Sequence, residues 1–188
     1  MNTAPCTKAP AESKTFRMHF GQHPELSNFG DSLAAPPTVT VALDNEWSAG
    51  TVLVGATLVV GQVVDLTLTD PGGGYEVNDP PEVEIEPPTG VSGGDPATYI
   101  ATATARVDPV TGQLAALTLT FGGQGYVVPP AVTIDGTATA TARIQKIEIW
   151  AVLSGGADAS DYAVTFECDT LGGAHLVEVG VLRVRAKP

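Results

Sequence analysis

Charged residues are scarce in this chain, and basic residues are the scarcest. Only 16% of the 188 residues are charged, and 9 Lys and Arg stand against 21 Asp and Glu, which gives a formal net charge of −12. Affinity for nucleic acid comes mainly from Lys and Arg at the phosphates, so we expect no binding to DNA or RNA. The acidity instead predicts a solubilising surface or a match to a basic partner surface.

Long apolar runs and cysteines are also lacking. No run approaches the roughly 20 residues of a membrane helix, so no membrane span is expected. Residues 1–15 lack the apolar segment of a signal peptide, so export by that route is not expected either. Cys6 and Cys168 do not make a disulfide framework, and a bridge between them is the less favoured alternative.

The sequence has no convincing amphipathic helix of ten or more residues. Short runs of Val, Thr, Ile and Leu are punctuated by 21 Gly and 15 Pro, and hydrophobic residues make up 43% of the chain. That content supports a real core, and the short punctuated runs are typical of strands and turns. The sequence therefore predicts an all-β protein.

An internal duplication is the strongest pattern present. Ala101–Val107 returns almost unchanged as Ala138–Ile144. Three further blocks match in the same order, namely Gly61–Thr69 with Gly112–Thr120, Gly72–Tyr75 with Gly123–Tyr126, and Pro80–Ile85 with Pro129–Ile134. Each copy is predicted to form a strand, a Gly-rich turn, a Pro-Pro segment, a strand, a turn and a Thr/Ala strand. Two such units, stacked on one another, could share a core that neither could bury alone.

The two copies differ mainly in one loop. The first copy carries twelve more residues than the second between Ile85 and Ala101, and Glu86–Ala97 is predicted to be a long loop. Tyr75 and Tyr126 are predicted to cover the Gly-rich turns and to anchor them.

The flanks of the repeats predict a second structural unit. We expect strands at residues 15–20, 37–43 and 51–60 before the repeats, and at 146–153, 162–168 and 175–185 after them. Together these predict one immunoglobulin-like β-sandwich, formed by residues 15–58 plus 146–188, with 59–145 as an inserted tandem repeat and 1–14 as an N-terminal arm. Val164, Phe166 and Cys168 would share one face, a β-bulge would fit near Gly180, and Trp150 is expected in the core.

Both parts resemble structural proteins of tailed bacteriophages. The repeat, seen at Gly123–Ala142, is similar to one found in phage tail-fibre and baseplate proteins. The flanks resemble a small immunoglobulin-like domain of the fibre–tail adaptor type, on the segments Phe20–Glu25, Ile149–Gly156, Asp161–Phe166 and Val181–Arg185. The resemblance implies a virion protein, assembled in the host cytoplasm, that binds tail, fibre or major capsid proteins and forms homo-oligomers, with a trimer as one option.

Side chains that could carry chemistry favour structural interpretations. Gly72–Gly74 lacks the Gly-Lys-Ser/Thr of a phosphate loop, so we expect a turn. His19 and His23 lie four apart on an expected strand and loop, which does not converge two metal ligands. Glu82, Glu84 and Glu86 predict a solvated strand face, although clustered carboxylates could also bind calcium. No nucleophile motif is present, and we expect no enzyme, cofactor or metal.

The leading hypothesis is therefore a non-enzymatic tail or fibre-attachment component. Alternatives are a decoration protein on the capsid exterior and a carbohydrate-binding module for host recognition. The module would need an exposed aromatic platform drawn from Trp47, Trp150, Tyr75, Tyr99, Tyr126 and Tyr162. The predicted partner contacts lie in the long loop and at one exposed tryptophan: Pro87, Pro88, Val91, Asp95, Tyr99 and Trp47.

Overall fold

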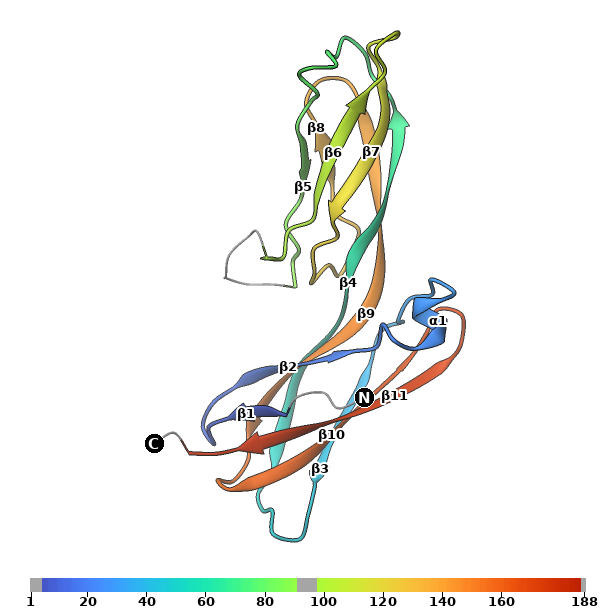
Figure 1. Cartoon of the computed structure of the whole chain (residues 1–188). Helices are drawn as coiled ribbons and strands as arrows, with labels where there is room; N and C mark the ends of the chain where they lie inside the picture. Colours follow the sequence, from blue (N-terminus) through green and yellow to red (C-terminus); the bar gives the residue numbers. More distant parts are fainter. Residues whose placement is uncertain (1–4, 91–97, 187–188) are drawn as a thin grey trace. The chain divides into compact units, whose positions relative to one another are not determined.

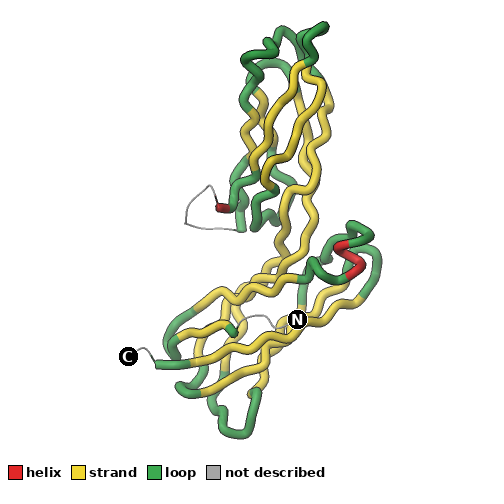
Figure 2. Tube along the Cα trace, viewed as in Figure 1, coloured by secondary structure: helices red, strands yellow, loops and turns green. Residues whose placement is uncertain are grey.

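The computed structural model describes residues 5–90 and 98–186, and strands dominate it (Figure 2). The strands are β1 (Cys6–Lys8), β2 (Lys14–His19), β3 (Thr38–Leu43), β4 (Val52–Asp70), β5 (Val83–Ile85), β6 (Thr102–Val107), β7 (Leu114–Phe121), β8 (Val132–Ile134), β9 (Thr139–Gly155), β10 (Ser160–Asp169) and β11 (His175–Val184). The helix α1 spans only Pro24–Ser27. The prediction of an all-β fold is confirmed. Within the described ranges no helix is long and apolar enough to cross a membrane.

The chain divides into two compact units. Unit 1 contains Met1–Val59 and Ile147–Pro188, and unit 2 contains Val60–Lys146 (Figure 1). The long strands β4 and β9 contribute residues to both units. Unit 2 is thus an insertion in the sequence of unit 1.

Unit 1 is built from two sheets that share one core. One sheet has the strand order β1-β11-β10-β3 and the other has the order β2-β9-β4. Each sheet therefore mixes strands from before and after the insertion. Inward-facing side chains of both sheets form a single cluster, which includes Phe16, Ile149, Tyr162, Phe166 and Leu182. The more specific immunoglobulin-like topology stays a prediction.

The strands β10 and β11 alternate regularly between core and surface. Val164, Phe166 and Cys168 are all buried on one face, as predicted. The predicted bulge at Gly180 is wrong, because the pairing of β11 with β10 continues through Gly180 without a register shift. Gly180 occupies a core position instead, where an added Cβ would lie 2.7 Å from the Phe16 ring. The large aromatic side chain on β2 is what requires a glycine there.

The predicted N-terminal arm is partly wrong. Residues 6–8 form β1, which pairs in parallel with β11, and Lys8 is only 2% exposed. The Lys8 ammonium donates to the carbonyls of Ala9 and Glu12 and, across the unit, to that of Gly155. Desolvation lowers the pKa of Lys8, and the Glu12 carboxylate opposes that shift. These hydrogen bonds tie the start of the chain to the end of β9.

Trp150 is buried, as predicted, but it is not part of the cluster between the two sheets. Its neighbours Ile149 and Ala151 take the core side of β9, so the indole must face the opposite side. There the Arg17 guanidinium lies 4.1 Å from the ring centroid, and the indole N–H donates to Glu148 Oε2 at 2.7 Å. On this side of β9, Trp150 is only 5% exposed and makes a cation–π contact and one hydrogen bond.

Unit 2 is assembled by pairing each sequence copy with the other. β6, the Thr/Ala strand of the first copy, pairs with β7, which opens the second copy. β9, the Thr/Ala strand of the second copy, lies beside β4 of the first. β5 pairs with β8 at equivalent positions, Val83 with Ile134 and Ile85 with Val132. The two copies are therefore interlocked about a pseudo-twofold relation and are not two stacked, self-contained units.

The side-chain hydrogen bonds and the core clusters of unit 2 also join one copy to the other. Thr102 and Thr120 hydroxyls bond at 2.7 Å, and their counterparts Thr139 and Thr69 bond at 2.8 Å. Two equivalent clusters result, each drawn from both copies. The first is Val63, Ile85, Ala101 and Tyr126, and the second is Val107, Leu114, Ile134 and Ala138 with Tyr75 packed against it. The prediction of a core shared by the copies is confirmed.

Candidate partner-binding surfaces

Two tyrosines fix the start of each Thr/Ala strand. Tyr126 Oη accepts a hydrogen bond from Ala101 N at 2.9 Å, and Tyr75 Oη accepts one from Ala138 N at 2.8 Å. Each ring also covers the Gly-rich turn of its own copy, since a Cβ on Gly123 would lie 2.8 Å from Tyr126 Cε2. Desolvation raises the pKa of Tyr126, opposed by the bond from Ala101. The predicted anchoring role of both tyrosines is confirmed, and each acts on the other copy.

The long loop of the first copy replaces a tight turn in the second. In the second copy, Gly136 with φ of +101° lets the chain turn directly from β8 into β9. Tyr75 Oη closes that turn by accepting from Thr137 N at 3.0 Å as well as from Ala138. The corresponding connection from β5 to β6 is longer, and its end is held by Gln124, whose N–H donates to Tyr99 O at 3.0 Å.

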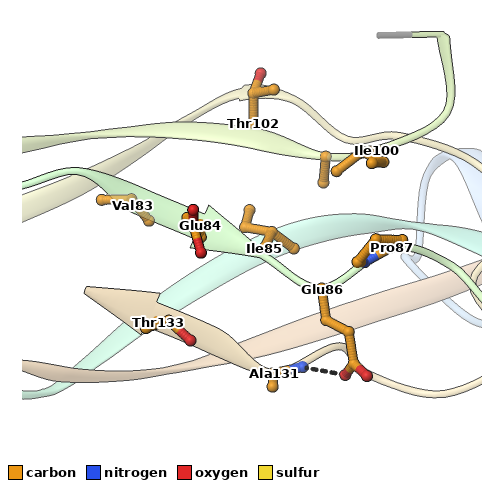
Figure 3. Close-up of a pocket in the computed structure, with 10 residues that line it drawn as sticks. Val83, Glu84, Ile85, Glu86, Pro87, Ile100, Thr102, Ala131 and Thr133 are labelled. Atoms are coloured by element: carbon orange, nitrogen blue, oxygen red, sulfur yellow. Dashed lines mark hydrogen bonds between the residues drawn. The ribbon is translucent and has the colours of Figure 1, made fainter. Parts of the chain in front are cut away.

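An open groove of about 610 Å³ lies where the first copy carries its long connection. Figure 3 shows β5 between Ile100 and Thr102 on one side and Ala131 and Thr133 on the other. Ala131 N donates to Glu86 Oε2 at 3.2 Å, which fixes one acidic side chain at the groove margin. The remaining lining is mostly aliphatic, from Val83, Ile85, Pro87 and Ala101. Glu84, Thr102 and Thr133 add polar groups to this lining, so the groove can receive an extended segment that carries both apolar and polar side chains.

The predicted contact residues are spread over both units. Pro87 is exposed and lines the groove, Pro88 is buried, and Tyr99 is half-buried at the base of the connection. Val91 and Asp95 lie outside the described residues. The groove itself was missed by sequence analysis, and its one available signal was the twelve-residue length difference between the copies.

Trp47 belongs to unit 1, in the connection between β3 and β4. Its side chain is 85% exposed, and the segment is held by Asn45 Oδ1, which accepts from Trp47 N and Ser48 Oγ. The wider aromatic platform is contradicted, because Trp150, Tyr126 and Tyr162 are at most 5% exposed. Of the six aromatic side chains considered for the platform, Trp47 is the one that is largely exposed.

Acidic side chains gather on unit 2. Glu82, Glu84 and Glu86 are exposed and alternate with Val83 and Ile85, as the sequence predicts. A second hollow of about 580 Å³ is bordered by Glu76, Asp79, Glu82 and Asp135. Across residues 5–90 and 98–186, no group of three or more His, Cys, Asp or Glu side chains is arranged to hold a metal ion.

The histidines of unit 1 take structural contacts. His23 Nε2 lies 2.9 Å from Glu178 Oε1 and the ring stacks on Phe20, while His19 Nδ1 accepts from Gly21 N. His175 Nδ1 lies 2.8 Å from Asp169 Oδ1. The His19 and His23 rings have separate partners, and neither pairs with a cysteine.

Both cysteines are free, and their environments differ. Cys168 is 3% exposed and donates to Ala34 O, whereas Cys6 is half-buried in β1. Burial raises the pKa of both thiols; the Asp169 carboxylate raises that of Cys168 further, and Lys14 opposes the shift at Cys6.

We expect Cys168 to resist alkylation in the folded protein. Reaction needs an accessible thiolate, so the deeper burial of Cys168 should make it react at least about tenfold more slowly than Cys6 at neutral pH. Mass spectrometry after brief iodoacetamide treatment should show modification at Cys6 first, and modification of both thiols in denaturant. Equal rates at the two thiols in the folded protein would contradict the burial of Cys168.

No protein-family model and no curated protein matches the sequence of this chain.

Proposed function

We propose that this chain is a non-enzymatic structural protein of a tailed-phage virion, acting as a tail or fibre-attachment component. The observation that supports this best is the construction of unit 2. Its tyrosines and threonines join the two repeat copies by hydrogen bonds, and an open groove of about 610 Å³ lies where the copies differ in length. The resemblance of the repeat to tail-fibre and baseplate proteins points the same way.

Copy number per particle tests the proposal. Quantitative mass spectrometry of purified particles that encode this chain should find it at about a dozen copies, as expected for a tail with rotational symmetry. Hundreds of copies would place it on the capsid exterior as a decoration protein instead. Its absence from particles would reject both structural roles.

Carbohydrate binding is a second candidate, and Trp47 is the observation that favours it. An exposed indole offers an apolar face on which a sugar ring can stack. Binding of the full chain to a glycan array, lost on Trp47→Ala and kept on Phe29→Ala, would support this role. Phe29 is a matched control because it is also exposed, at 81%.

A further inference from the structure

β3 ends the four-stranded sheet of unit 1 with one open edge. Its partner is β10, and no described strand pairs with the other side. One position beyond the Leu43–Tyr162 pair, Asp44 N donates to Asp161 O, so the backbone of Asp44 points toward β10, although Asp161 N itself donates to Ser48 Oγ. Because this direction alternates along a strand, the backbone groups of Val39, Val41 and Leu43 point away from β10. Among the described residues, none hydrogen-bonds to these outward groups.

This edge also lacks the usual protection against pairing. Open edges normally carry charges, prolines or bulges. β2, a margin of the other sheet, has Lys14, Arg17 and His19. β3 has no charged residue, and neither has the part of β4 in unit 1. Leu43 is 50% exposed and Leu53 is 63% exposed, so apolar surface is left open here.

β3 and β4 lie on the same side of unit 1. Phe16 and Met18 of β2 pack against Gly180 of β11. The edge strand β2 of the three-stranded sheet therefore lies over β11 of the four-stranded sheet. β4 is the opposite edge strand of the three-stranded sheet, so it lies on the same side of unit 1 as β3, the edge strand of the four-stranded sheet. The two uncharged strands therefore form one continuous open flank, which we call the β3–β4 edge.

We propose that two copies of this chain associate through the β3–β4 edge, with the β3 strands antiparallel about a twofold axis at Val41. In this register Val41 pairs with Val41 of the second copy, and Val39 pairs with its Leu43. Every outward N–H and C=O of the three residues then has a partner. Sliding the axis to Val39 would oppose Val41 with Pro37, which has no N–H to donate.

The side chains fit this register. On the core side the half-exposed Leu43 is covered by Val39 of the second copy. On the outer side Thr40 faces Ala42 and Thr38 faces Asp44, so no like charges are opposed. Two chains with net charge −12 repel one another over most of their surface, and an uncharged edge is where they can approach closely. The contact is isologous and closes at two copies.

The test is the mass of the full chain in solution. Light scattering and sedimentation equilibrium should give twice the 19.2 kDa chain mass, falling to one chain on dilution. The double variants Thr40→Glu with Ala42→Glu, and Thr40→Lys with Ala42→Lys, should each be monomeric because like charges face each other. Mixing the two variants should restore the dimer, which also shows that both are folded.

Val179→Lys is the matched control. Val179 is 52% exposed on the outer face of the same sheet, but on β11, away from the edge. It should remain dimeric; dissociation equal to that of the edge variants would indicate face-to-face stacking and overturn the proposal. A monomer at all concentrations, a trimer, or edge variants that stay dimeric without mixing would also overturn it. A wild-type dimer that is absent from virions would leave the edge contact standing and reject the proposed virion role alone.

Discussion

Gly61→Ala is expected to lower the free energy of unfolding by about 3 kcal/mol, as overpacking between fixed backbones does. An added Cβ would lie 2.0 Å from the Gln145 carbonyl oxygen and 2.7 Å from Lys146 Cα. Both are backbone atoms of β9, so no side-chain rotation can relieve the contact. β4 and β9 would have to separate within unit 2, next to the paired hydrogen bonds between Gly61 and Tyr126.

Urea unfolding followed by circular dichroism measures this loss, and hydrogen-exchange mass spectrometry locates it. Protection should fall mainly within residues 60–146. Gly73→Ala is the control, because no atom lies within 4 Å of its added Cβ and its backbone is not left-handed. That variant should stay within about 0.5 kcal/mol of wild type. Equal losses in the two variants would show that close strand approach is not what Gly61 provides.

The alignment of the copies pairs Gly61 with Gly112 but hides that the two glycines serve different purposes. Gly112 has φ of +66°, a conformation that favours glycine in the turn before β7. Gly61 has no such φ and lies inside β4, which continues from the flank. The match between the copies therefore marks Gly61 as an important position but does not give the physical reason. That reason is the close approach of the partner strand β9, which the sequence does not show.

Strand positions could be predicted from alternation, whereas strand partners could not. Both copies offer the same Leu-Thr and Ala-Thr patterns, so side chains alone do not decide whether pairing occurs within or between copies. The connection decides it. β6 and β7 are joined by a short turn in which Asp108 Oδ1 accepts from Val110 N and Thr111 N, and these bonds lower the pKa of Asp108. That hairpin spans the copy boundary and leaves β4 to lie beside β9.

The candidate surfaces were predicted less completely than the fold. The exposure of Trp47 followed from its polar, turn-rich surroundings, and the structure confirms it. The groove beside β5 and the open edge of β3 could not be predicted. Both depend on which strands lack a neighbour, and that is fixed by long-range topology and not by local pattern.

Tyr126→Phe is expected to lower the free energy of unfolding by about 2 kcal/mol, because the buried Ala101 N–H loses its acceptor. Tyr75→Phe should act in the same direction but less strongly. Its acceptor serves Thr137 N and Ala138 N, which are exposed and part-buried, so water can replace part of what is lost. Urea midpoints of both variants, compared with wild type, measure the two effects.

The double variant tests whether the pseudo-twofold exchange stabilises both halves of unit 2. Tyr126 and Tyr75 lie in different core clusters, so their losses should add within about 0.5 kcal/mol. Tyr99→Phe is the control, since the hydrogen bond found for Tyr99 is made by its backbone carbonyl, which accepts from Gln124 N and is kept in the variant, so stability should change little. A larger loss for Tyr75→Phe than for Tyr126→Phe would contradict the burial argument. If the double variant lost no more free energy of unfolding than one of the single variants, the two hydrogen bonds would not contribute independently. The copies would then be coupled more tightly than their separate core clusters imply.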